Sequence, residues 1–71
     1  MQEKQQIINC QLIKARRNEL GYTLRQLEEL TGIDAASLSR IENCIKTSIE
    51  TDTLAKIAQA LNIPSGDILN F

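Results

Sequence analysis

Residues 23–43 contain start and stop signals for two short helices with almost no chain between them. Thr23 and Gln26 have the spacing of a capping box, in which each side chain bonds to the backbone amide of the other residue. Gly32 follows where a left-handed residue would end this helix, and Asp34 can cap the next one. The sequence therefore predicts two helices that meet at a sharp corner.

The second of these helices is expected over about residues 35–42, and three further helical segments are expected elsewhere. In each helix, residues at helical spacing should face the interior. In a first helix ending at Gly21 they are Ile8, Leu12, Ala15 and Glu19, and in the helix that starts at Thr23 they are Leu24, Leu27 and Leu30. Helix 35–42 contributes Leu38 and Ile41, and a fourth helix contributes Leu54, Ile57, Ala58 and Leu61. Ser48 or Thr51 should cap that last helix, and Asn62 should close it. Pro64 is placed near the start of a short final turn, after which Ile68, Leu69 and Phe71 are expected to fold back onto the core.

Length and composition agree with a small helical unit. A chain of 71 residues has enough surface to bury for one domain, which we expect to span residues 1–71. The hydrophobic content is 42%, but valine is absent and Tyr22 and Phe71 are the aromatic residues, so strands are not expected. The predicted fold class is therefore all-α, with five helices in a compact domain.

The two cysteines, Cys10 and Cys44, do not suggest a metal site or a disulfide framework. Two thiols without any histidine cannot supply a zinc ligand set, and both are expected to be free in a reducing, cytoplasmic setting. A redox role for Cys44 is the alternative. The sequence has no apolar run long enough for a signal peptide or a membrane span.

No pattern in the sequence indicates catalysis. There is no histidine base, no nucleophile with a plausible partner and no glycine loop to hold phosphate, so we expect no enzyme activity, no cofactor and no small-molecule ligand.

Several short motifs, in order, resemble the Cro/C1 repressor family, also called the XRE family, from about Ile8 to Leu69. They are Leu12 to Arg16, Thr23 with Leu27, Gly32-Ile33, Leu38 to Asn43, and Leu54 to Ile63. The resemblance implies a lambda-repressor-like helix-turn-helix over about residues 23–43. It also implies that helix 35–42 is a recognition helix that lies in the DNA major groove.

Three residues depart from the family pattern. Leu24 stands where the family commonly has a glutamine that contacts phosphate, so Arg25 or Asn43 would have to supply that contact. Glu28 replaces an alanine at a close approach of two helices and must point outward or pair with an arginine. Cys44 replaces a glycine, so the backbone there is expected to differ.

The candidate DNA contacts lie on and around helix 35–42. Arg40 suits bidentate reading of guanine, while Ala35 and Ala36 could contact thymine methyl groups. The hydroxyls of Ser37 and Ser39 could donate to bases or phosphates. Phosphate contacts are assigned to Arg25, Asn43 and Lys46. For each residue, the alternative is an ordinary solvated surface position.

By the same resemblance, an arginine near the end of the first helix pairs with the glutamate of Ile41-Glu42-Asn43. We assign Arg16 and Glu42 to this structural ion pair.

The function expected is sequence-specific binding of double-stranded DNA by a small, repressor-like regulator. The net charge of -1, from 8 basic and 9 acidic residues, argues weakly against it, and residues 23–48 hold three basic and four acidic residues. So few phosphate contacts per subunit suggest a homodimer with half-sites about one helical turn apart. The alternative is a protein-interaction module, with Ile45 and Ile49 serving a partner.

Overall fold

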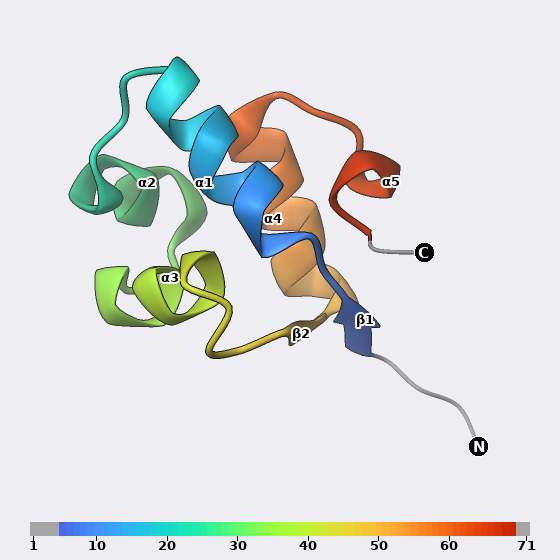
Figure 1. Cartoon of the computed structure of the whole chain (residues 1–71). Coiled ribbons are helices and arrows are strands. Elements are labelled where there is room, and N and C mark those ends of the chain that lie inside the picture. Colours follow the sequence, from blue (N-terminus) through green and yellow to red (C-terminus); the bar gives the residue numbers. More distant parts are fainter. Residues whose placement is uncertain (1–4, 70–71) are drawn as a thin grey trace.

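The structure is a computed structural model that describes residues 5–69 of the chain. In this range the elements are β1 (Gln5–Ile7), α1 (Cys10–Glu19), α2 (Leu24–Thr31), α3 (Ala35–Glu42), β2 (Ser48–Glu50), α4 (Thr51–Leu61) and α5 (Ser65–Ile68). In Figure 1, α4 lies between the α2–α3 pair on the left and α5 on the right, with α1 packed across it. The predicted fold with five helices is confirmed for the described residues.

A small antiparallel pair of strands is present, and the expectation of no strands was wrong. β1 pairs with β2 with Gln6 opposite Ile49, and an isolated bridge joins Ile8 to Leu69. The backbone amide of Ile8 also donates to the carbonyl of Thr47 at 3.0 Å. Strands of three residues depend on where two segments meet and on the burial of Ile49 more than on the β-propensity of the sequence.

The predicted stop and start signals are confirmed at the helix ends. Gly21 and Gly32 both have φ of 77°, and Asn62 closes α4 with φ of 58°. The capping box of α2 is complete, with the Thr23 amide donating to Gln26 Oε1 at 2.8 Å and the Gln26 amide donating to Thr23 Oγ1 at 3.0 Å. Because these bonds satisfy amides that a helix leaves open, they fix where each helix begins.

The inward face of α1 differs from the predicted stripe. Asn9 caps the helix by accepting from the Leu12 amide at 3.3 Å, so Ile8 lies in the bridge before the helix. Cys10 and Ile13 are the buried residues of α1, whereas Ala15 is exposed. The predicted stripe was out of phase because it counted Ile8 as part of the helix.

The core is built around α4 and contains one or more residues from each of the five helices. Its buried members are Ile8, Ile13, Leu27, Leu38, Ile41, Ile49, Leu54, Ile57, Ala58, Leu61 and Ile68. All four residues predicted to face inward from α4 are among them. The N-cap of α4 is Glu50, one residue before Thr51, and not Ser48 or Thr51.

Leu30 does not face the core as expected, whereas the C-terminal residues Ile68 and Leu69 do. Leu30 is 54% exposed and not inward, because the core face of α2 runs through Leu24, Leu27 and Thr31 and leaves Leu30 at its edge. Ile68 is fully buried and Leu69 packs partly against the core, while Phe71 lies outside the described residues.

No helix in residues 5–69 is long and apolar enough to span a membrane.

Candidate nucleic-acid interface

The corner between α2 and α3 is held by a small set of local hydrogen bonds. The Gly32 amide donates to the Glu28 carbonyl at 2.8 Å, which ends α2 in the left-handed conformation. Buried Thr31 donates its hydroxyl to the Leu27 carbonyl at 2.8 Å and accepts from the Ile33 amide at 3.1 Å. Sequence reasoning did not single out Thr31, although a hydroxyl beside a helix-ending glycine is a usable signal for a turn.

Asp34 begins α3 as predicted. Its carboxylate accepts from the Ser37 amide at 3.1 Å and from the Ser37 hydroxyl at 2.8 Å. These two bonds, and above all the one from the Ser37 hydroxyl, lower the pKa of Asp34 below its usual value of 3.8. The carboxylate is therefore ionised at neutral pH. It lies at the N-terminal end of α3, where the helix dipole favours negative charge.

One face of α3 is open to solvent along its whole length. Ala36 and Arg40 of the helix and Asn43 at its C-cap follow at intervals of four and three residues, and all three are exposed. Leu38 and Ile41 occupy the opposite face and are buried, as predicted. A row of small and polar side chains opposite an anchored apolar face is what a helix needs to enter a groove about 12 Å wide.

The remaining candidate contacts flank this row. Ala35, Ser37 and Ser39 are half-buried at its edges. The Asn43 side-chain amide donates to Ser39 Oγ at 3.2 Å, so both Ser37 and Ser39 already have a partner within the protein. Their hydroxyls are thereby held in place, and each can still accept a hydrogen bond.

Three cations are available on this side of the molecule. Arg25, Arg40 and Lys46 are exposed, and none of them forms an ion pair within residues 5–69. Glu28 of α2 is half-buried and forms an ion pair with neither Arg25 nor Arg40. The pairing of Glu28 with an arginine, one of its two expected arrangements, is therefore not seen in residues 5–69. Leu24 packs partly against the core and contributes apolar contact instead of a polar group.

The structural ion pair involves Arg17, and the assignment to Arg16 was wrong. Arg17 Nε donates to Glu42 Oε2 at 2.6 Å and Arg17 Nη2 to Glu42 Oε1 at 3.0 Å. Arg16 instead donates to the Leu61 carbonyl at 3.0 Å and to Glu19 at 3.1 Å. Arg17 falls on the inward face of α1, four residues after Ile13, so the error has the same cause as the mistaken stripe.

This pair changes the electrostatics of the candidate interface. Residues 23–48 hold three basic and four acidic residues, a net of 3 - 4 = -1. Glu42 is buried and neutralised by Arg17, which lies outside this range, so counting the partner gives 4 - 4 = 0. The exposed surface of the helix-turn-helix is therefore less acidic than the sequence suggests.

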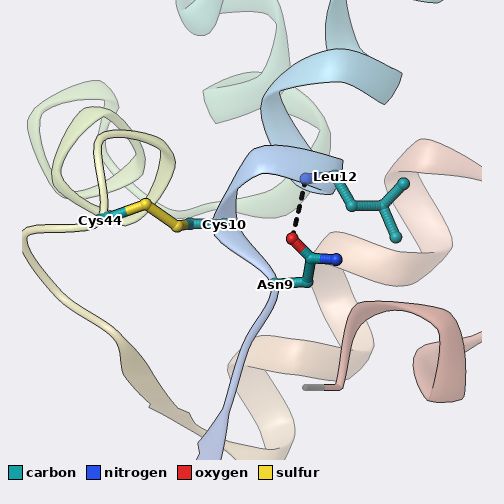
Figure 2. The surroundings of a disulfide bond; sticks show 4 residues. All are labelled: Asn9, Cys10, Leu12 and Cys44. Carbon is teal, nitrogen blue, oxygen red and sulfur yellow. Dashed lines mark hydrogen bonds between the residues drawn. A yellow bond between two sulfur atoms is a disulfide. The ribbon is translucent and has the colours of Figure 1, made fainter. Parts of the chain in front are cut away.

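Cys44 is not a free thiol. It forms a disulfide with Cys10, which contradicts the expectation from sequence, and the bond joins the start of α1 to the loop after α3 (Figure 2). With the Cys44 amide donating to Ile41 and the Ile45 amide to Arg40, Cys44 occupies the left-handed position of a Schellman motif at φ of 62°. Glycine adopts this φ more easily, which accounts for the glycine that the family usually has at this position. No local signal in the sequence brings residues 34 positions apart together.

In residues 5–69 no group of three or more His, Cys, Asp or Glu side chains is arranged to hold a metal ion.

Comparisons with known proteins agree with this geometry. A family model described as helix-turn-helix matches residues 13–68. The HTH-type transcriptional repressor RghR of Bacillus subtilis (strain 168) is 40% identical over 52 residues, which are 73% of this chain and 38% of RghR. The HTH-type transcriptional regulator SinR of Bacillus licheniformis is 35% identical over 60 residues, 84% of this chain and 54% of SinR. This chain thus spans about half of these relatives or less.

Solved structures of SinR have the same fold. The crystal structure of SinR, a master regulator for biofilm formation, in complex with DNA has a TM-score of 0.76 and 33% identity, covering 80% of this chain and 90% of that one. The N-terminal DNA-binding domain of SinR from Bacillus subtilis has a TM-score of 0.75 and 33% identity, covering 80% and 83%. From the match to its family model and from its fold, this chain belongs to the helix-turn-helix family, in its Cro/C1-type branch.

Proposed function

We propose that this protein binds double-stranded DNA in a sequence-specific manner and regulates transcription, with α3 inserted in the major groove. The observation that carries the proposal is the exposed row of Ala36, Arg40 and Asn43 on a helix whose other face is buried and whose start is fixed by Asp34. The likeness to SinR, which has been solved in complex with DNA, supports it. The likeness to a repressor, RghR, supports a repressor-like role.

The residues divide into two kinds of contact. Arg40, at the centre of the row, reads guanine through O6 and N7, and the methyl groups of Ala35 and Ala36 contact thymine. Ser37 and Ser39 lie at the edges of the row and accept or donate hydrogen bonds there. Three groups hold the DNA backbone, namely Asn43 at the end of the row and Arg25 and Lys46 outside it, since phosphate contacts set the orientation of a recognition helix.

The charge available per subunit favours a homodimer. Three unpaired cations would neutralise only two or three phosphates, and binding at physiological salt strengthens with the number of phosphates neutralised. A twofold dimer doubles that number and places two α3 helices about one turn of DNA apart.

The proposed role in DNA binding also suggests where the protein acts and that it is not an enzyme. A protein that binds chromosomal DNA acts in the cytoplasm of a bacterial cell, and we propose that location. We also propose that it has no enzyme activity, as its similarity is to transcriptional regulators.

Selection from random duplexes, followed by Arg40→Ala, tests the assignment. We expect the variant to lose preference at one base pair, at a cost of about 1–3 kcal/mol, while general binding remains. Lys46→Ala is the matched control, because loss of a phosphate contact should weaken all sequences alike and reduce the salt slope by about 1. An unchanged selected motif with Arg40→Ala would show that α3 does not read bases through Arg40.

A protein-interaction module is the second candidate, because Leu30 and Ile45 are 54% and 74% exposed. Isolated exposed apolar residues are common, whereas apolar patches often mark contacts with other proteins. Ile49, the other residue expected to serve a partner, is buried in the core and cannot contribute to an exposed apolar surface. Titrating a labelled duplex at two salt concentrations separates the candidates: steep salt dependence favours DNA binding, and no binding at low salt favours the interaction module.

A further inference from the structure

The Cys10–Cys44 disulfide encloses the whole helix-turn-helix. The two cysteines are 34 residues apart, with α1, α2 and α3 between them, and their Cα atoms lie 5.6 Å apart. Figure 2 shows the bond running from the first turn of α1 to the loop that leaves α3. The crosslink therefore connects the end of the candidate recognition helix directly to the body of the domain.

The position of Cys44 links this bond to the candidate DNA contacts. Asn43 precedes it and Lys46 follows two residues later, and both were assigned above to the DNA backbone. Cys44 itself is held at φ of 62°, a conformation that L-amino acids other than Asn and Asp rarely adopt. Backbone bonds from Ile45 and Lys46 to the Arg40 carbonyl, at 2.9 and 3.1 Å, depend on that conformation.

The two sulfur atoms differ in ways that suit thiol–disulfide exchange. Cys44 is exposed and lines a groove of about 410 Å³ between α1 and the end of α3, with walls that include Gln11, Lys14, Asn18 and Asn43. Cys10 is 9% exposed and is the first residue of α1, after the N-cap Asn9. The dipole of a helix stabilises a thiolate at this position, so Cys10 is a good leaving group when Cys44 is attacked.

The structure also indicates that the fold does not depend on the crosslink. Cys44 is exposed, Cys10 lies outside the buried hydrophobic cluster, and the bonds that start α2 and α3 form without either cysteine. Reduction should therefore change the loop after α3 while the core remains packed.

We propose that the Cys10–Cys44 pair is a redox switch. It exchanges with a low-molecular-weight thiol and the corresponding disulfide, and the oxidised form is the one that binds DNA tightly. Disulfides in a reducing compartment are usually transient and often sense redox change, so the pair would form when small disulfides accumulate. The inference rests on the DNA-binding function proposed above.

Reduction of the Cys10–Cys44 bond takes two exchange steps. A small thiolate attacks Cys44 Sγ, the Cys44–Cys10 bond breaks, and Cys10 leaves as a thiolate that takes up a proton. A second small thiolate attacks the small-molecule sulfur of the mixed disulfide, which releases the Cys44 thiolate and one small disulfide. Two electrons pass from the two small thiols to the protein, and the reverse sequence oxidises the protein with the small disulfide as the oxidant.

Reduction should weaken DNA binding by loosening the loop after α3. Without the crosslink, the loop can leave the left-handed conformation at Cys44, and Asn43 and Lys46 lose their fixed positions. Binding must then order the loop again, which lowers affinity. We expect a loss of about fivefold in affinity, the lower end of what the left-handed conformation of one non-glycine residue implies.

The test uses the protein equilibrated with 2-mercaptoethanol or with its disulfide, 2-hydroxyethyl disulfide. Maleimide labelling under denaturing conditions gives the fraction of free thiol, circular dichroism gives the helix content, and fluorescence anisotropy gives the affinity for a duplex. We expect unchanged helix content, affinity about fivefold higher in the oxidised form, and reversal when the thiol is restored.

Two variants serve as controls. Cys44→Gly removes one sulfur while glycine accepts φ of 62°, and Cys10→Ser removes the other while leaving the Cys44 backbone unchanged. Neither variant can form the Cys10–Cys44 bond, so the redox pair should not raise the DNA affinity of either one. Equal DNA affinity of the fully oxidised and fully reduced protein would overturn the switch, and so would a disulfide that the thiol cannot reduce in the folded protein. Absence of binding in both states would instead overturn the proposed DNA-binding function, on which the switch depends.

Discussion

Replacing Arg17 by methionine should remove a large part of the stability of this fold. The side chains of Arg17 and Glu42 are only 12% and 3% exposed, and two hydrogen bonds of 2.6 and 3.0 Å join them. Arg17 also donates to the Tyr22 carbonyl at 2.7 Å. Methionine fills a similar volume but supplies no donor, so the Glu42 carboxylate is left buried and unpaired.

Breaking a buried ion pair by removing one partner costs about 3–5 kcal/mol, because the remaining charge has no compensation. For a chain of 71 residues, the free energy of unfolding is expected to be about 4–11 kcal/mol in total. The melting temperature should therefore fall by at least about 12 °C, and a substantial fraction of the variant could be unfolded at 37 °C. Urea unfolding followed by circular dichroism at 222 nm measures the loss, at about neutral pH.

Arg16→Met is the matched control, with the same substitution one position earlier. Arg16 pairs with Glu19 on the surface, where their side chains are 27% and 68% exposed, so its loss should cost at most about 1.5 kcal/mol, including the bond to the Leu61 carbonyl. The double variant Arg17→Met with Glu42→Leu should recover about 2 kcal/mol, since no buried charge remains. If Arg16→Met proved as costly as Arg17→Met, the structural ion pair would be misassigned.

Two further predictions concern the helix ends. Gly32→Ala should lower the free energy of unfolding by about 1–2 kcal/mol in thermal or urea unfolding, because φ is 77° there and nothing lies near the added Cβ. Gly66→Ala, in α5 with equally open surroundings and no positive φ, should change it by less than about 0.5 kcal/mol, and a similar loss at both positions would contradict the conformational argument. Because hydrogen bonds from Ser37 lower the pKa of Asp34, the stability from this group is fully present above the unfolded value of 3.8 and is lost as the pH falls through the lower folded pKa. Urea unfolding between about pH 2 and 6 should show that part of the pH dependence disappearing in Asp34→Asn, which keeps the cap but does not titrate; an identical pH dependence would contradict the assignment.

Much of the candidate site could be predicted because its signals are local. The Thr23–Gln26 box, the left-handed Gly32 and the Asp34 cap all act through hydrogen bonds within four residues, so the printed order of residues is enough to place α2 and α3. The exposed row on α3 then follows from the helical period. Which residues of that row contact DNA stays a prediction, because contact depends on the nucleic acid as well as on the protein.

The two pairings that the sequence did not disclose depend on where distant segments meet. The choice of Arg17 over Arg16 depends on which face of α1 packs against α3, where Glu42 lies. The pairing of Cys10 with Cys44 depends on the packing of α1 against the end of α3. Local hydrogen bonds determine helix ends from sequence alone, whereas pairs across 25 or 34 residues form only after the core has brought their helices together, so only the tertiary structure decides them.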